Sequence, residues 1–109
     1  MSYSIIALPI FRKELKRLAK KYFSLKTDLA SLFETLEVNP VQGTPLGKNC
    51  YKIRLSITSK NKGKSGGARL ITNYVIADET VYLLSIYDKS EKENLTENEL
   101  QELLKFVTD

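Results

Sequence analysis

Cationic side chains in the middle of the chain have a spacing that suits phosphate groups. Lys52 and Arg54 alternate with apolar residues in YKIRLSIT (residues 51–58), which is typical of a strand with one polar and one apolar face. At roughly 3.3 Å per residue the two would lie about 6.6 Å apart on the polar face. Arg69 heads the next apolar run. If the strand register turned Arg69 toward the same face, the three would form a cationic pocket; otherwise Lys52 and Arg54 are simply the solvated side of a strand.

The loop KNKGKSGG (residues 60–67) between these strands is rich in lysine and glycine. Gly63-Lys64-Ser65 matches the end of the phosphate-loop motif, but Thr58 occupies the place of its first glycine, and a strand follows instead of the required helix. A nucleotide-binding loop is therefore excluded. Two interpretations remain, a solvated hairpin tip or a group that contacts a phosphate-rich substrate, and the candidate substrate-binding residues are Lys60, Lys62, Lys64 and Ser65.

The chain contains no histidine, which removes several classes of chemistry. Catalytic triads, histidine-ligated metals and two-histidine ribonuclease mechanisms all need the one side chain whose ordinary pKa is near neutrality. Cys50 is the only cysteine, so it cannot form an internal disulfide and lacks the companions of a zinc site. No metal or cofactor is expected.

Charge is divided unevenly along the chain. The whole chain carries +4 and residues 90–109 carry −4, so residues 1–89 carry +8. A basic body favours nucleic acid or another phosphate-rich partner, although a generally solvated basic surface would have the same composition.

The length of 109 residues fits a single domain, 1–109, with its own core. No apolar run approaches the roughly 20 residues of a membrane span, and the start lacks the basic segment of a signal peptide. We expect a cytoplasmic protein that does not enter the membrane.

Hydrophobic periodicity predicts an α+β order. We expect a short strand at 4–8, then two helices, the first starting at Pro9 and the second covering 25–36, which pack as an antiparallel hairpin. Ser24 is the expected N-cap of the second helix and Asn39-Pro40 its stop. Strands are expected at 51–58, 68–76 and 81–87, with a turn at 77–80. A last helix begins with a capping box of Thr96 and Glu99.

Three segments in this order resemble the RelE-like ribonuclease toxins of bacterial toxin–antitoxin modules, especially their HigB-type branch. They are YKIRL (51–55), KSGGARLI (64–71) and VYLLSIYDKSEKENL (81–95). The resemblance implies a small antiparallel-cored sheet packed by an N-terminal helical hairpin, plus a C-terminal helix. It also implies a toxin that enters the ribosomal A site and cleaves messenger RNA as an endoribonuclease, silenced by a cognate antitoxin in a toxin–antitoxin hetero-oligomer.

The family's site residues carry over to the matching positions. They imply a catalytic set of Lys52, Arg54, Arg69, Tyr87 and Lys89. Attack of a ribose 2′-OH on phosphorus builds charge on the phosphoryl oxygens, which preorganised cations stabilise without a metal. Arg69 suits this role because its planar fork can hold two oxygens, while a lysine or Tyr87 would act as base or acid. Ser90 departs from the family pattern, since several relatives have an arginine after the lysine.

Two other functions remain open for the same fold. One is a ParE-like toxin that inhibits DNA gyrase without cutting RNA, and the other is a non-catalytic RNA- or partner-binding module. The basic 51–69 region favours the nuclease.

Overall fold

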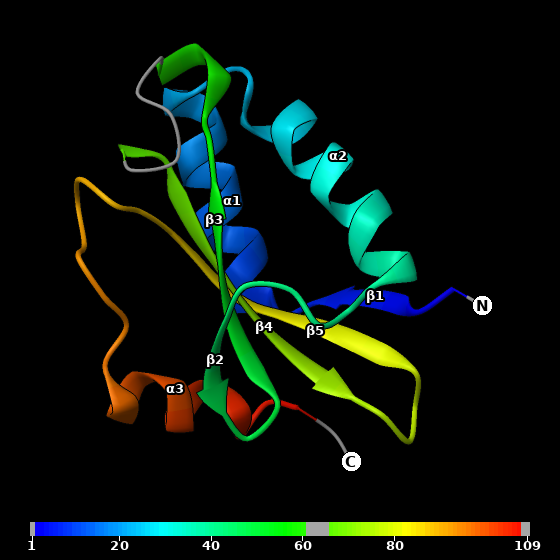
Figure 1. The fold of residues 1–109 in the computed structure, drawn as a ribbon. Helices are drawn as coiled ribbons and strands as arrows, with labels where there is room; N and C mark the ends of the chain where they lie inside the picture. The colour runs from blue at the N-terminus through cyan, green and yellow to red at the C-terminus, as the bar shows by residue number, and fades with distance from the viewer. Residues whose placement is uncertain (1, 61–65, 108–109) are drawn as a thin grey trace.

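The computed structural model describes residues 2–60 and 66–107 of the chain (Figure 1). Along the chain the elements are β1 (Ser4–Ala7), α1 (Pro9–Lys21), α2 (Leu25–Val38), β2 (Thr44–Gly47), β3 (Cys50–Leu55), the 3₁₀ turn η1 (Thr58–Lys60), β4 (Ala68–Val75), β5 (Thr80–Asp88) and α3 (Glu97–Leu104). This arrangement confirms the predicted α+β class.

One sheet organises the molecule, with strand order β1-β5-β4-β3-β2. β2 through β5 are joined by antiparallel pairs, whereas β1 pairs with β5 in parallel, starting at Ser4 opposite Thr80. Between β1 and β5 the chain forms α1, α2 and the strands β2–β4, so the two strands of the parallel pair are far apart in sequence. The predicted antiparallel-cored sheet is therefore confirmed, with β1 added at one edge.

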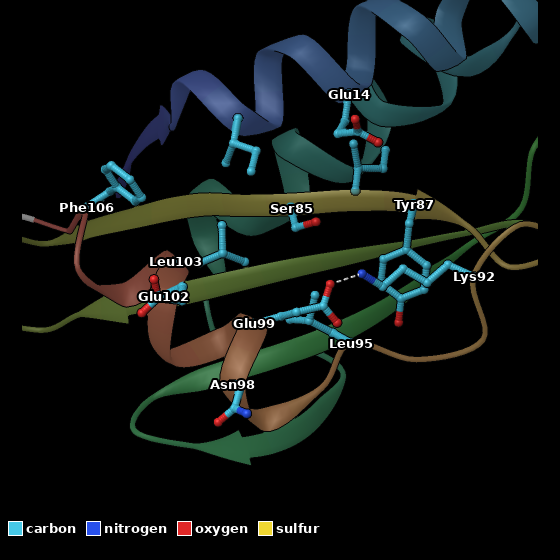
Figure 2. Close-up of a pocket in the computed structure, with 12 residues that line it drawn as sticks. Glu14, Ser85, Tyr87, Lys92, Leu95, Asn98, Glu99, Glu102, Leu103 and Phe106 are labelled. Carbon is cyan, nitrogen blue, oxygen red and sulfur yellow. Dashed lines mark hydrogen bonds and ion pairs between the residues drawn. The ribbon is translucent and has the colours of Figure 1, made fainter.

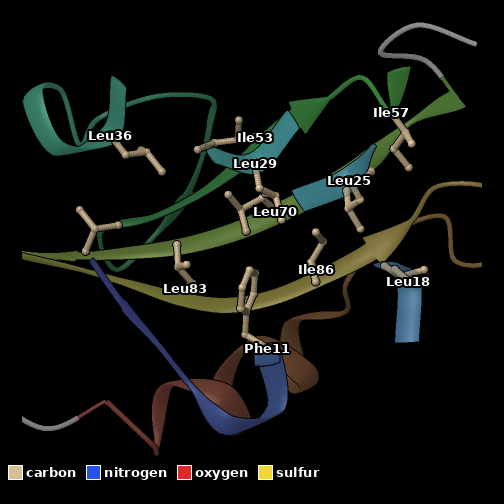
Figure 3. Packing of buried hydrophobic residues seen from close by; sticks show 12 residues of the cluster. Phe11, Leu18, Leu25, Leu29, Leu36, Ile53, Ile57, Leu70, Leu83 and Ile86 are labelled. Carbon is tan, nitrogen blue, oxygen red and sulfur yellow. The ribbon is translucent and has the colours of Figure 1, made fainter. Parts of the chain in front are cut away.

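The two N-terminal helices pack on one face of the sheet and form the main core (Figure 3). Pro9 occupies the first turn of α1, where its missing N–H needs no partner, and α2 runs back after a short turn (Figure 1). Buried members from the helices and strands include Phe11, Leu18, Leu25, Leu36, Ile53, Leu70 and Ile86. Each such side chain stabilises the fold by about 1.5–3 kcal/mol relative to its exposed state.

The C-terminal helix α3 packs on the other face of the sheet. Leu100 and Leu103 contact a second cluster that includes Ile71, Leu84 and Tyr87. The Thr96 hydroxyl caps the helix by accepting from the Glu99 N–H, and the Glu99 carboxylate accepts from the Thr96 N–H at 2.9 Å. The predicted capping box is confirmed. α3 covers part of this face, so the second face is the less completely covered one.

The structure differs from the sequence-based expectations in its short elements. β2 lies between α2 and β3, where we expected no strand, because its Pro and Gly content obscures a four-residue edge strand. The strand expected at 51–58 ends at Leu55, and residues 58–60 form a 3₁₀ turn. Ser24 precedes α2, but its hydroxyl bonds Asp28 and Ser59 instead of capping the helix.

None of the described helices is long and apolar enough to cross a membrane.

Candidate active site

Arg54, Arg69 and Tyr87 lie side by side across three strands. Arg54 is directly opposite Arg69 in the β3–β4 pair, and Arg69 is directly opposite Tyr87 in the β4–β5 pair. Directly opposite residues share a face, with Cβ atoms roughly 4.5–5.5 Å apart. The register that the sequence leaves open thus turns Arg69 toward the face of Arg54. We call these three residues the cross-strand row.

Lys52 adds a cation to the same face, two residues before Arg54. It lies opposite Ile71 of β4, and its Nζ donates to Asn94 Oδ1 at 3.3 Å. Asn94 belongs to the segment that leads into α3, so that segment reaches back over the sheet. The contact with Asn94 is one that sequence reasoning missed, since nothing in the spacing of residues 52 and 94 signals it.

Arg69 is held in an unusual environment for a cation. It is 4% exposed, and its Nη1 donates to the carbonyl of Ala68 at 3.1 Å. Burial and then the positive charge of Arg54 lower the pKa of Arg69, while Tyr87 opposes this change. The guanidinium stays protonated nonetheless, because arginine does not lose its proton in proteins. A buried cation therefore lies directly beside an exposed one of the same charge.

The Tyr87 hydroxyl is buried, and among the described residues it makes no hydrogen bond of good geometry. Burial raises the pKa of Tyr87, while the backbone amide of Leu95 and the charge of Arg69 act in the opposite direction. The phenol is therefore protonated at neutral pH and can donate a proton. Lys92 lies 5.9 Å from the centre of the ring. Of the predicted acid and base roles, this environment favours the acid for Tyr87.

Two glycines let neighbouring backbones approach the strands that carry the cations. A Cβ on Gly67 would lie 2.0 Å from the Leu55 carbonyl oxygen, and one on Gly43 would lie 2.3 Å from that of Lys52. Both distances are shorter than any real contact. Gly43 also has φ +93°, in the left-handed region. Nothing in the spacing of the sequence signals that Gly43 packs against Lys52.

The other predicted site residues are placed less uniformly. Lys89 follows β5, where its N–H bonds Gly67 and its Nζ lies 3.4 Å from the Glu93 carbonyl. Lys60 is turned to the opposite side of the sheet, where it forms an ion pair with Asp88 at 2.7 Å. Lys62, Lys64 and Ser65 lie outside the described residues. The proposed roles of Lys60, Lys62, Lys64 and Ser65 in substrate binding stay predictions.

A cavity of about 500 Å³ lies beside Tyr87, between α1, β5 and α3 (Figure 2). Its lining includes Ile10, Ser85, Tyr87, Leu95, Leu103 and Phe106. Lys92 forms an ion pair with Glu99 at its mouth (Figure 2). The cavity is mostly apolar, and Lys52, Arg54 and Arg69 do not line it. It is therefore a neighbour of the cationic site and not the site itself.

Within residues 2–60 and 66–107, no group of three or more histidine, cysteine, aspartate or glutamate side chains is placed to hold a metal ion.

The fold is α+β, with Lys52, Arg54, Arg69 and the buried phenol of Tyr87 on one face of its sheet. The chain matches the family described as the RelE toxin of the RelE/RelB toxin–antitoxin system over residues 9–109, and it belongs to that family. It is thus a toxin-type component of a toxin–antitoxin system. Assignment to the HigB-type branch stays a prediction.

Solved structures of the same fold agree with this assignment. The chain is similar to a double arginine-to-alanine mutant of E. coli toxin RelE in the free state, with TM-score 0.66, 19% identity, and coverage of 99% of this chain and 100% of the other. It is also similar to a chain of a RelBE toxin–antitoxin complex from Mycobacterium tuberculosis, with TM-score 0.57, 18% identity and coverage of 81% and 92%. At these identities the likeness concerns the fold.

Proposed function

We propose that this protein is a ribosome-dependent endoribonuclease that cleaves messenger RNA and inhibits translation. The observation that carries the proposal is the cross-strand row, which aligns two guanidinium groups and a protonated phenol on one face. Membership of the RelE toxin family supports the same reading.

In the proposed reaction the ribose 2′-OH attacks the adjacent phosphorus and expels the 5′-oxygen of the next nucleotide. Arg54, the exposed member of the row, meets the phosphate from solution, and Arg69 lies next to it, already fixed by the sheet. Fixed cations stabilise the charge that develops on the phosphoryl oxygens without reorganising during the reaction. Lys52 lies one step along the same face and suits a flanking phosphate.

Proton transfer is the second requirement. Tyr87 is protonated at neutral pH because burial raises its pKa, so it would give its proton to the leaving 5′-oxygen. The Tyr87 hydroxyl is buried beside the backbone amide of Leu95, so substrate access would need the connection from β5 to α3 to shift. A lysine of the site as general base remains the prediction made from the family, and the ribosome would contribute by positioning the RNA.

The proposed partners are the ribosome with its messenger RNA and a cognate antitoxin. The M. tuberculosis structure is a toxin–antitoxin complex, and another similar structure contains the E. coli RelE mutant with an antitoxin RelBc peptide, at TM-score 0.50, 23% identity, and coverage of 99% of this chain and 100% of the other. An acidic antitoxin segment would suit the basic body of this chain, and its affinity would fall as salt rises.

Expression of the chain in bacteria followed by mapping of message 5′ ends tests the proposal. We expect new 5′ ends within coding regions for the parent, about 100-fold fewer for Arg69→Ala, and impairment of Arg69→Lys, which loses the bidentate fork. Arg12→Ala is the matched control, because it removes an equal charge from an exposed position of α1. Intact messages with altered plasmid supercoiling would instead identify a gyrase inhibitor and overturn the proposal.

A further inference from the structure

Asp88, the last residue of β5, has a fully buried side chain and a complete set of partners. Its Oδ1 accepts hydrogen bonds from Lys60 Nζ at 2.7 Å and from the Ser90 N–H and hydroxyl at 2.9 and 2.7 Å. Its Oδ2 accepts from the Tyr22 hydroxyl at 2.5 Å and lies 3.7 Å from Lys21 Nζ. A carboxylate so occupied has no room for a ligand, and its role must be exerted on the residues that it holds.

Those residues come from three segments that are distant in sequence. Tyr22 follows α1, Lys60 ends η1, and Ser90 lies in the connection from β5 to α3. Lys60 is also 5.3 Å from the centre of the Tyr22 ring, with Lys21 at 5.2 Å. Glu91, the other acid near this cluster, is bonded to Arg17 and Lys21. The carboxylate of Asp88 thus joins the helices, the start of the lysine loop and the end of β5.

The backbone at Asp88 is fixed as firmly as its side chain. The Asp88 carbonyl accepts from the N–H groups of Glu91 and Lys92 at 2.9 and 3.0 Å, and the next N–H, of Lys89, donates to Gly67 at 3.0 Å. Residues on either side of Asp88 in sequence are Tyr87 and Lys89, both predicted members of the site. Because side chains alternate along a strand, holding Asp88 on one face sets the direction of Tyr87 on the other.

We propose that Asp88 is a positioning residue for the site: by tying Tyr22, Lys60 and Ser90 together, its carboxylate fixes the end of β5 and so the place of Tyr87 beside Arg69. The catalytic meaning of this positioning rests on the function proposed above, whereas the positioning itself does not. Lys60 then acts by holding Asp88, and its contact with substrate is not required.

The first measurement follows Tyr87 directly and needs no activity. The chain is labelled with 3-fluorotyrosine, and Tyr87→Phe identifies the fluorine resonance of that residue. We expect Asp88→Asn to shift the Tyr87 resonance while the resonances of Tyr3 and Tyr74, which pack against each other with ring centres 5.4 Å apart, stay in place. Asp78→Asn is the matched control, since it makes the same substitution at an exposed turn position.

Tyr22→Phe is the second variant, because it removes one bond to Asp88 and leaves the buried ion pair intact. If Asp88→Asn fails to fold, Tyr22→Phe decides the question. An unchanged Tyr87 resonance in every variant that folds overturns the proposal.

The second measurement is the rate of messenger RNA cleavage on ribosomes, under single-turnover and steady-state conditions. We expect kcat to fall between about 10- and 100-fold in Asp88→Asn with KM little changed, because a misplaced group slows the chemical step more than binding. A loss confined to KM, or a fall in kcat equal to that of Asp78→Asn, overturns the catalytic part. If the parent cleaves nothing, the proposed function fails, and the fluorine shifts still test whether Asp88 positions Tyr87.

Discussion

At the end of β5, the buried polar groups on the two sides of the sheet differ in whether they have hydrogen-bond partners. On the side of α1, the Asp88 carboxylate is fully buried and bonded through both oxygens. On the other side, one residue earlier, the Tyr87 hydroxyl is buried without a hydrogen bond of good geometry among the described residues. The neighbouring Arg69 is a buried cation beside a second arginine.

This difference separates a side with satisfied polar groups from the side on which we propose the active site. Buried polar groups in proteins are normally hydrogen-bonded, and a buried charge is normally paired, so the Asp88 side follows the requirements of stability. The Tyr87 side gives up some of that stability. A substrate phosphate would supply the hydrogen-bond acceptor that the Tyr87 hydroxyl lacks among the described residues, as we expect of a functional face.

The largest expected effect on stability comes from Asp88→Ala. Removing one partner of a buried ion pair leaves Lys60, whose side chain is 10% exposed, without compensation, and we expect a loss of about 3–5 kcal/mol in the free energy of unfolding. Urea denaturation measures it. A loss below about 1 kcal/mol, as for an exposed pair, would remove the distinction between the two sides.

Asp88 should also make the stability of the folded protein depend on pH in the acid range. The pKa of Asp88 is well below its ordinary value, because Lys60, Tyr22 and Ser90 stabilise the carboxylate against the opposing effect of burial. A lowered pKa in the folded state means that the stabilisation is present above the ordinary carboxyl pKa and is lost as the pH falls from about 5. As the pH falls from about 5, the free energy of unfolding should therefore decrease less in Asp88→Asn than in the parent.

An intermediate effect is expected from Gly67→Ala. The added Cβ would meet the Leu55 carbonyl oxygen at 2.0 Å, so the start of β4 must shift, at a cost of about 1–3 kcal/mol. Gly47→Ala is the control: it has open space around it but φ +86°, which costs about 1–2 kcal/mol without moving the site. Only Gly67→Ala should also slow RNA cleavage, because Arg69 moves with β4. Equal cleavage rates in the two variants would contradict this.

The smallest effect on stability is expected where hydroxyls are unsatisfied. Tyr87→Phe and Thr72→Val each remove a buried hydroxyl that has no hydrogen-bond partner among the described residues. Each change should be neutral or stabilising, within about 1 kcal/mol. Cleavage should fall in Tyr87→Phe alone, measured on ribosome-bound messenger RNA. A strong loss of stability in Tyr87→Phe would mean that the hydroxyl is satisfied after all.

Elements with strong periodicity were predictable, and contacts across the fold were not. The two amphipathic helices, the central strands and the Thr96 capping box follow from spacing that local physics dictates. Whether Arg69 shares a face with Arg54 depends on pairing register, which a one-residue slip would reverse. The resemblance to the toxin family named Tyr87 and Lys89, whose surroundings only the fold defines.

The ion pair of Lys60 and Asp88 could not be predicted from the sequence either, because it too is a contact across the fold. We expected Lys60 either in a solvated hairpin tip or in contact with substrate, and it lies 28 residues from Asp88 in the chain. β2 was missed because a four-residue strand with proline and glycine has no periodicity to detect.

The parallel pairing of β1 with β5 also orders events during synthesis. Ser4 pairs with Thr80, so β1 has no strand partner in the sheet until β5 has been synthesised. The cross-strand row needs β5 too, whereas the antiparallel β3–β4 pair can form earlier from neighbouring residues. A nascent chain therefore carries Lys52, Arg54 and Arg69 before Tyr87 is present beside them. One strand, β5, therefore both pairs with β1 and completes the cross-strand row.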